Sequence, residues 1–333
     1  MSVQIFYLHP SSHIVPNVFK IGYWPYLIHL KKQISIVSGP SSSDLANGIA
    51  KLMNTEAVPV ESRIFSDGEC KLTIKARFDE RICVIIQSTY PPTDRHLLQT
   101  LMIVRKCVDD KAAKVIAVIP YLAYARQDRA FSDGEIISIA LVARLLEACG
   151  TAHLITVDIH SERALSYFTI PARNVSSIPL LADYARNVLK LSNPLIVSPD
   201  YGGITRAAEF ARLLKTDMIY FEKSRDLSTG EVIIKNEKDT HEYKKKLEGR
   251  DVLLIDDMIS SGSTIAKACD FIKKNGANKV HAMCVHALLG TDMAQKMKTA
   301  GIQDIIATNS IPNKFAKVDL SPLLLDTLNK IIG

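Results

Sequence analysis

Residues 252–264 read VLLIDDMISSGST, and this stretch decides the fold class. It begins with a continuous apolar run, typical of a central strand in a parallel sheet, and it ends in small residues that open a helical pattern. Ligands of parallel α/β sheets bind at the carboxyl ends of strands, where loop N–H groups and a helix N-terminus attract an anion. The stretch therefore predicts a phosphate-binding loop. Its residues are Ser260, Ser261, Gly262, Ser263 and Thr264.

Two adjacent carboxylates, Asp256 and Asp257, stand between the apolar run and the small residues. They would repel a bare phosphate, so they suit hydroxyl groups or a bridging Mg2+. A phosphate at one end and vicinal hydroxyls at the other describe ribose 5-phosphate as the ligand. The alternative is an ordinary capped helix after a buried strand, which is disfavoured because two adjacent acids are costly there without a ligand.

Short apolar, β-branched runs alternate with longer helical patterns from residue 34 onward. The expected strands cover residues 34–38, 71–76, 82–87, 114–119, 153–158, 195–198, 218–222, 251–256, 280–285 and 304–308. The expected helices cover residues 44–53, 95–109, 135–148, 179–190, 203–214, 263–274 and 292–299. This alternation predicts an α/β fold with right-handed crossovers and mainly parallel sheets that helices cover on both faces.

The strand–helix pattern runs through roughly twice, which indicates two domains in a chain of 333 residues. We expect an N-terminal extension of unknown structure over residues 1–33, a first domain over 34–177, and a second domain over 178–310 that carries the phosphate loop. No flexible linker separates the two domains, so we expect them to pack closely. A C-terminal helix over 311–333 is a candidate for packing on the first domain.

The composition is that of a soluble globular protein, with 47% apolar and 23% charged residues and a net charge of +6. The densest basic run, the lysines 244–246, lies beside two glutamates and is interpreted as a solvated face. The six cysteines form no C-x-x-C pair, as expected for buried free thiols in a reducing compartment. No apolar run of eighteen residues and no signal peptide occur. We therefore expect a cytoplasmic protein with no nucleic-acid or membrane partner.

A P-loop kinase of the usual form is excluded, because the sequence has no G-x-x-x-x-G-K-[ST] motif and no Gly-Lys dipeptide. Two other motifs stand out, FSDGE at residues 65–69 and PYLAYARQDR at 120–129. Together with the loop, they resemble the ribose-phosphate pyrophosphokinase (phosphoribosyl pyrophosphate synthetase) family over nearly all of residues 34–330.

The resemblance implies two tandem type I phosphoribosyltransferase-like domains, each with a mainly parallel sheet flanked by helices. It implies transfer of the diphosphoryl group of Mg-ATP to the C1 hydroxyl of ribose 5-phosphate. The residues that it assigns to ATP are Phe65, Asp67, Gly68, Glu69, Arg126, Gln127 and Asp128.

The resemblance also gives roles to residues that would be structural in isolation. His160 ends the run VDIH, where a lone His more often packs or caps, and Asp200 lies in SPDYGG at another strand end. The resemblance makes both of them ligands of the Mg2+ cofactor. Lys223 and Arg225, in FEKSR, would alone be a solvated basic turn. The resemblance places them on a mobile flap as catalytic residues that stabilise charge on the transferring group, and Arg225 also joins the acidic pair in contacting ribose 5-phosphate.

Two features depart from many members of that family. Ser260 stands where many members carry an acid, and residues 130–139 (AFSDGEIISI) are less basic than the matching segment of bacterial regulatory enzymes. Both features point to the archaeal-type branch, so the resemblance carries no expectation of classical control by phosphate or ADP. The second FSDGE, at residues 131–135, is attributed mostly to chance because it precedes a helix whereas the first precedes a strand.

In the family the first FSDGE motif reaches into a neighbouring subunit's site, which implies a homo-oligomer built from dimers. Two alternatives stay open. A phosphoribosyltransferase would share the phosphate loop, but it would need neither motif and would usually be a single domain. A non-catalytic regulatory subunit would be expected to lose metal or flap residues. The metal residues His160 and Asp200 and the flap residues Lys223 and Arg225 are all present.

Overall fold

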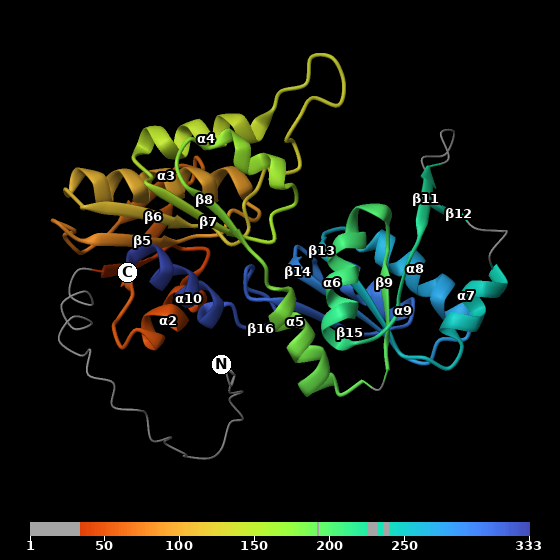
Figure 1. Cartoon of the computed structure of the whole chain (residues 1–333). Coiled ribbons are helices and arrows are strands. Elements are labelled where there is room, and N and C mark those ends of the chain that lie inside the picture. Colours follow the sequence, from red (N-terminus) through yellow and green to blue (C-terminus); the bar gives the residue numbers. More distant parts are fainter. Residues whose placement is uncertain (1–33, 192, 226–231, 236–239) are drawn as a thin grey trace, which may run out of the picture. The chain divides into compact units, whose positions relative to one another are not determined.

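Two six-stranded parallel sheets form the frame of the protein, as Figure 1 shows for the computed structural model. The structure describes residues 34–191, 193–225, 232–235 and 240–333. Residues Ile34–Gly333 form one compact unit. The expected extension over residues 1–33 lies outside the described residues.

The first sheet has the strand order β2-β1-β5-β6-β7-β8, and every neighbouring pair is parallel. Its strands are β1 (Ile34–Ser38), β2 (Val58–Pro59), β5 (Ile82–Ile86), β6 (Lys114–Val118), β7 (His153–Val157) and β8 (Ala172–Val175). Helices α3 (Thr93–Asp109) and α4 (Ser138–Cys149) cover one face, and α2 (Ser43–Leu52) covers the other. A short 3-10 helix, Glu162–Tyr167, follows β7.

The second sheet has the order β10-β9-β13-β14-β15-β16 and is also parallel throughout. Its strands are β9 (Leu195–Ser198), β10 (Met218–Tyr220), β13 (Val252–Ile259), β14 (Val280–Ala287), β15 (Ile302–Thr308) and β16 (Ala316–Val318). Helices α5 (Ile178–Tyr184) and α6 (Ile204–Leu214) pack on one face. Helices α8 (Ser263–Lys274) and α9 (Thr291–Thr299) pack on the other.

Two antiparallel hairpins and one charged helix lie outside the two parallel sheets. One hairpin joins β3 (Glu61–Ile64) to β4 (Cys70–Thr73), and the other joins β11 (Glu222–Arg225) to β12 (Val232–Lys235). Helix α7 (Thr240–Leu247) carries the lysine run in its last turn, and all three lysines are exposed, as expected for a solvated face.

One apolar cluster contains residues of both sheets, so their inner faces share a core. It includes Ile36 and Ile116 of the first sheet and Leu253 and Ile255 of the second, all at most 1% exposed. Burying such side chains contributes about 1.5–3 kcal/mol each. The shared core keeps the carboxyl ends of the two sets of strands at a defined separation, which is what a site built from both sheets requires.

Helix α10 (Ser321–Ile332) packs on α2, and the two lie side by side in Figure 1. The close approach needs Gly48, because a Cβ there would lie 2.3 Å from Ser321 Oγ. The expected helix over 311–333 was wrong at its start, since residues 316–318 form strand β16 and the helix begins only at Ser321. Pro322 in the first turn favours that start, because its fixed φ suits a helix N-terminus.

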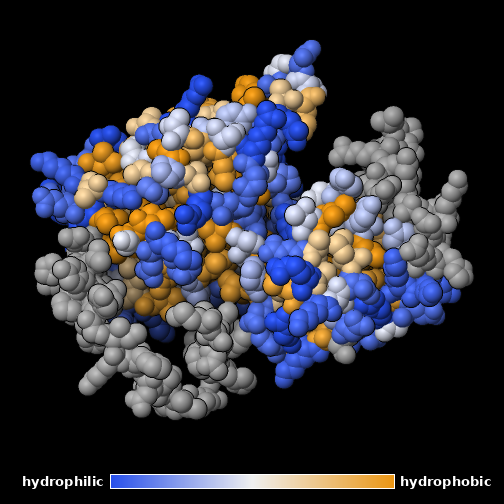
Figure 2. Space-filling model, in the orientation of Figure 1, coloured by the Kyte–Doolittle hydropathy of each residue, from blue (hydrophilic) through white to orange (hydrophobic). Residues whose placement is uncertain are grey.

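Hydrophilic residues dominate the face that Figure 2 shows, as expected from the charged content of 23%. Among the helices that the structure describes, none combines the length and the apolar composition that a bilayer crossing requires.

Candidate active site

A cavity of about 250 Å3 lies where strands β7, β9 and β13 end. It gathers residues that the sequence predicted from four separate motifs. The predicted residues that line it are Arg126, His160, Asp200, Asp256, Asp257, Ser260, Ser261, Gly262 and Thr264. Strands β9 and β13 are neighbours in the second sheet, so their carboxyl ends lie at one edge of it. Strand β7 belongs to the first sheet, and the core that the two sheets share holds its end near the same place.

The acidic pair belongs to the strand itself. We expected the strand to end at residue 256, but β13 continues to Ile259 and pairs with β14 through Met258 and His286. The N–H of Asp257 donates to Asp256 Oδ1 at 2.9 Å. Burial, and then the neighbouring charge of Asp257, raise the pKa of Asp256 well above its usual range.

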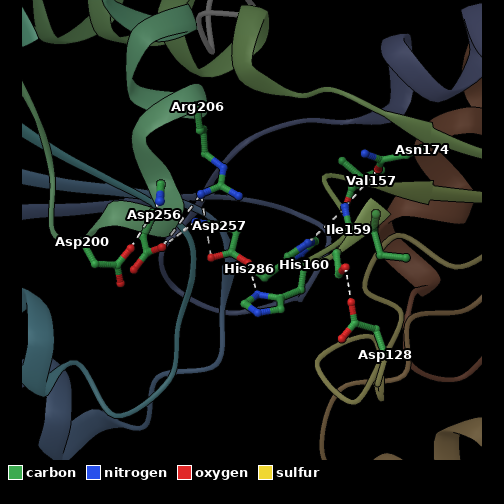
Figure 3. Close-up of polar contacts among 12 residues, drawn as sticks. Asp128, Val157, Ile159, His160, Asn174, Asp200, Arg206, Asp256, Asp257 and His286 are labelled. Atoms are coloured by element: carbon green, nitrogen blue, oxygen red, sulfur yellow. Dashed lines mark hydrogen bonds and ion pairs between the residues drawn. The ribbon is translucent and has the colours of Figure 1, made fainter. Parts of the chain in front are cut away.

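Asp257 meets His160 from the first sheet. His160 Nδ1 lies 2.6 Å from Asp257 Oδ2, and the Asp257 side chain is 8% exposed (Figure 3). Burial alone would raise the pKa of Asp257, but the hydrogen bond from His160 and the charge of Arg206 outweigh it and hold that pKa below its usual range. The contact therefore joins an ionised carboxylate of β13 to a histidine that lies three residues after the end of β7.

Arg206, on α6, is a site residue that the sequence reasoning missed. Its Nη1 lies 3.9 Å from Oδ1 of both Asp256 and Asp257, and its side chain is 18% exposed (Figure 3). A signal was present, because an arginine in the first turn of the helix after SPDYGG must lie near the end of β9. Arg206 is a built-in cation beside two acids, and it partly neutralises them.

The small-residue loop has the backbone that the sequence suggested. Gly262 caps α8 with φ 64°, in the left-handed region, and a Cβ there would lie 2.8 Å from Met297 Sδ. Ser261 Oγ and Ser263 Oγ lie 3.0 Å apart. Ser260 and Ser261 are exposed, and the helix N-terminus follows at once. These features suit an anion, because loop and helix N–H groups with hydroxyl donors attract negative charge.

Asp200 lies two residues after the end of β9 and caps the short 3-10 turn Tyr201–Gly203. Its Oδ1 accepts the N–H of Gly203 at 3.2 Å, and its carboxylate lines the cavity. Among the described residues no three His, Cys, Asp or Glu side chains are arranged to hold a metal ion by themselves. Mg2+ usually takes one or two carboxylates together with water and substrate phosphates, so the oxygen donors present fit a site that a phosphate completes.

Of the polar residues in the motif PYLAYARQDR, one lines the cavity and others bond to neighbouring protein groups. Arg126 lines the cavity, whereas Gln127 Nε2 donates to Glu135 Oε2 at 3.0 Å. Asp128 does not line the cavity, since its side chain is 3% exposed and its Oδ2 accepts the hydroxyl proton of Ser161 at 2.6 Å, and its assignment to ATP stays a prediction. In this structure the Asp128 carboxylate is bonded to Ser161, the residue next to His160.

Comparison with known proteins agrees with the resemblance. The model of the N-terminal domain of ribose phosphate pyrophosphokinase matches residues 34–150, and that of the phosphoribosyl transferase domain matches residues 165–319. The ribose-phosphate pyrophosphokinase of Sulfurisphaera tokodaii is 34% identical over 87% of this chain and 98% of its own length. The chain belongs to the ribose-phosphate pyrophosphokinase family.

Other similar proteins support this family membership, and the family is one of enzymes. The Methanopyrus kandleri ribose-phosphate pyrophosphokinase is 36% identical over 87% of this chain and 96% of its own length. Both relatives are archaeal, which agrees with the predicted likeness to the archaeal-type branch. The crystal structure of phosphoribosylpyrophosphate synthetase from Mycobacterium smegmatis aligns with a TM-score of 0.78 and 24% identity, over 90% of this chain and 98% of that chain. This likeness confirms the predicted fold of two phosphoribosyltransferase-type domains.

The family's FSDGE motif forms the tip of the β3–β4 hairpin, outside the cavity lining. The N–H of Phe65 donates to the carbonyl of Glu69 at 2.8 Å, and Gly68 turns the chain at φ 93°. Phe65 is 38% exposed, with the Arg63 guanidinium 5.1 Å from its ring centre. The assignment of Phe65, Asp67, Gly68 and Glu69 to ATP stays a prediction, and it needs a second subunit if the tip reaches a neighbouring site.

The second FSDGE copy shares its local setting with the first. An arginine precedes each phenylalanine by two positions, and Arg129 lies 5.3 Å from the Phe131 ring centre. The two differ at the glutamate, because Glu135 Oε2 accepts the N–H of Phe131 at 2.7 Å, so that this carboxylate is bonded to the backbone of its own loop. The second copy is thus a loop closed on itself, whereas the first is a hairpin tip.

The flap residues of the family, Lys223 and Arg225, lie on β11, whose hairpin with β12 follows the end of β10. Their side chains fall outside the described residues, so their catalytic role stays a prediction.

Proposed function

We propose that this chain is a ribose-phosphate diphosphokinase, which transfers the diphosphoryl group of Mg-ATP to the C1 hydroxyl of ribose 5-phosphate. The products are phosphoribosyl pyrophosphate and AMP. One observation carries the proposal: a single cavity joins an anion-binding loop, an acidic pair, a histidine and an arginine, in a chain that matches the family along both of its halves.

Ribose 5-phosphate would occupy the β13–α8 end of the cavity. The 5-phosphate would bind the N–H and hydroxyl groups of residues 260–264, with the helix N-terminus favouring its charge. Asp256 is the better candidate for the ribose hydroxyls, because its side chain is 18% exposed whereas that of Asp257 is 8% exposed and already bonded to His160.

ATP and its metal would occupy the His160–Asp200 end. Arg126 lines this part of the cavity and would contact the phosphates, while His160 and Asp200 would hold Mg2+ together with phosphate oxygens. Bound Mg2+ would neutralise charge on the phosphate chain. Gln127 and the FSDGE tip of a neighbouring subunit would contribute to the nucleotide site, in a cytoplasmic homo-oligomer built from dimers that binds neither nucleic acid nor membrane.

The transfer requires positioning and charge neutralisation more than covalent chemistry by the protein. The C1 hydroxyl would lose its proton to water as its oxygen forms a bond to the β-phosphorus, while the bond from that phosphorus to the α–β bridging oxygen breaks, so that AMP leaves. Lys223 and Arg225 would stabilise the charge that develops on the transferring group, and Arg225 would also contact ribose 5-phosphate.

The test is to mix the purified full chain with ribose 5-phosphate, Mg2+ and ATP and to measure AMP by chromatography. The proposal expects AMP and phosphoribosyl pyrophosphate in equal amounts. ADP as the only nucleotide product would contradict a diphosphoryl transfer. No AMP, combined with binding of phosphoribosyl pyrophosphate, would identify a non-catalytic relative.

A further inference from the structure

A buried histidine of the second sheet hydrogen-bonds to the first sheet beside the active site. His286, on β14, is 2% exposed, with its Nε2 3.1 Å from the carbonyl oxygen of Val157 and its Nδ1 2.8 Å from Ser310 Oγ. A carbonyl can only accept a hydrogen bond, so Nε2 carries a proton. Burial lowers the pKa of His286 to about 4, which leaves the ring neutral and Nδ1 an acceptor for the Ser310 hydroxyl.

The hydrogen bonds continue from His286 to other loops at this edge of the sheets. Ser88, after β5, donates its hydroxyl proton to the carbonyl of Ser310 at 2.6 Å. The N–H of Tyr121, after β6, donates to Ser88 Oγ at 3.1 Å, and the Tyr121 ring packs edge-on against the imidazole at 5.1 Å. Both ring nitrogens and one edge of His286 are thus engaged, which holds the imidazole in a single orientation.

His286 contacts β7 and β13, and the two members of the His160–Asp257 pair lie just after β7 and on β13. Val157 is the last residue of β7, three residues before His160. On the other side, His286 pairs in the sheet register with Met258, which follows Asp257. Figure 3 shows the His286 ring between these strand ends, close to the bond that joins His160 to Asp257.

We propose that His286 is a positioning residue that sets His160 against Asp257 across the two sheets. The Nε2–H donor fixes the end of β7, and the strand pairing fixes the end of β13. The effect of His286 on the reaction rests on the proposed function, whereas its effect on the His160–Asp257 geometry does not.

Substitution of His286 by glutamine or by asparagine distinguishes the role of the Nε2–H donor from that of the rest of the imidazole ring. Gln can place its amide N–H near the position of Nε2 and keep the bond to Val157, whereas Asn is too short. His281 provides the control, because it lies on the same strand, is 3% exposed, and contacts Asp304 at 2.9 Å instead of the cavity. The variants are His286→Gln, His286→Asn and His281→Asn in the full chain.

His286→Asn should lower kcat by about 10–100-fold, the usual cost of losing a partner that orients a site residue. The KM for ribose 5-phosphate should change less than about threefold, because the phosphate loop does not depend on this contact. His286→Gln should keep kcat within about threefold of the original, and His281→Asn should leave it unchanged even if it lowers the thermal midpoint. Crystal structures supply the second readout: the His160 Nδ1–Asp257 Oδ2 bond should be broken by Asn and kept by Gln.

Three results would overturn the inference: an unbroken His160–Asp257 bond in His286→Asn, an equal loss of kcat in Gln and Asn variants, or an equal loss in His281→Asn. If the original chain releases no AMP, the proposed function fails, and the crystal structures still decide whether His286 positions the pair.

Discussion

Replacement of Gly262 by alanine should weaken both the fold and the binding of ribose 5-phosphate. Gly262 has φ 64°, and a Cβ there would lie 2.8 Å from Met297 Sδ and 2.9 Å from Met293 Cγ. A left-handed backbone costs an L-residue about 1–2 kcal/mol. A crowded methyl group adds about 1–3 kcal/mol when its neighbours cannot move fully aside. The free energy of unfolding should therefore fall by about 2–5 kcal/mol.

Gly249 supplies a matched control, because it has φ 71° and no atom within 4 Å of the position of its Cβ. Gly249→Ala should show the backbone strain alone, about 1–2 kcal/mol. Urea unfolding measures both variants, and the difference between them isolates the clash with the two methionines. In an AMP-release assay, Gly262→Ala should raise the KM for ribose 5-phosphate at least about tenfold, since a misplacement of about 1 Å can cost a factor of about 100.

Equal destabilisation by the two alanines would refute the steric argument, because it would show that the methionines move aside freely. A clear loss of stability with an unchanged KM would refute the placement of the phosphate on this loop.

Other substitutions probe the charges of the site. Asp256→Asn should raise the thermal midpoint at pH 7 while reducing activity, because burial and Asp257 raise the pKa of Asp256. With Asp256 present, the folded protein loses stability as the pH rises from the unfolded pKa of Asp256, about 3.9, through its higher folded pKa, so the stability gained by Asp256→Asn should vanish below about pH 4. A difference in thermal midpoint between Asp256→Asn and the original protein that stays the same from pH 4 to pH 8 would contradict this. Arg206→Leu should lower the thermal midpoint, and that midpoint should rise more steeply with added Mg2+, because a divalent cation can replace the missing positive charge beside the two acids. Arg212 is exposed on the same helix, and Arg212→Leu should change neither the midpoint nor its response to Mg2+. Lys223→Ala should slow AMP formation at least about 100-fold with an unchanged circular dichroism spectrum, and an ordinary rate would remove Lys223 from the mechanism.

The local elements of the site could be predicted well from the sequence. The helix expected over residues 263–274 is α8 with the same bounds, and the strands expected over 34–38 and 195–198 are β1 and β9. Each strand is a short run of buried apolar residues, and the helix shows helical periodicity after a run of small residues. Such signals lie within a dozen neighbouring residues, so the sequence alone reveals them.

Three of the four edge strands of the two six-stranded sheets were not predicted, whereas the fourth, β10, was. Strands β2, β8 and β16 have two to four residues each and were not expected. Their residues are mostly exposed or half-buried, so they show neither a continuous apolar run nor a clean alternation, and pairing with a neighbouring strand is what makes them strands.

By itself the sequence determined the α/β class, the small-residue loop that opens α8 and the family, because these depend on local patterns and on motifs that stand in fixed order along the chain. Tertiary structure alone decided which polar groups meet. His160 and Asp257 lie 97 residues apart, and the burial of Asp128 leaves no local mark that separates it from an ordinary surface charge. The position of Arg206 after SPDYGG indicates a place near the end of β9, but only the tertiary structure shows that it contacts both acids. The loop at residues 252–264 explains where ribose 5-phosphate would bind. The packing of the two sheets explains why its second acid is already bonded to a histidine.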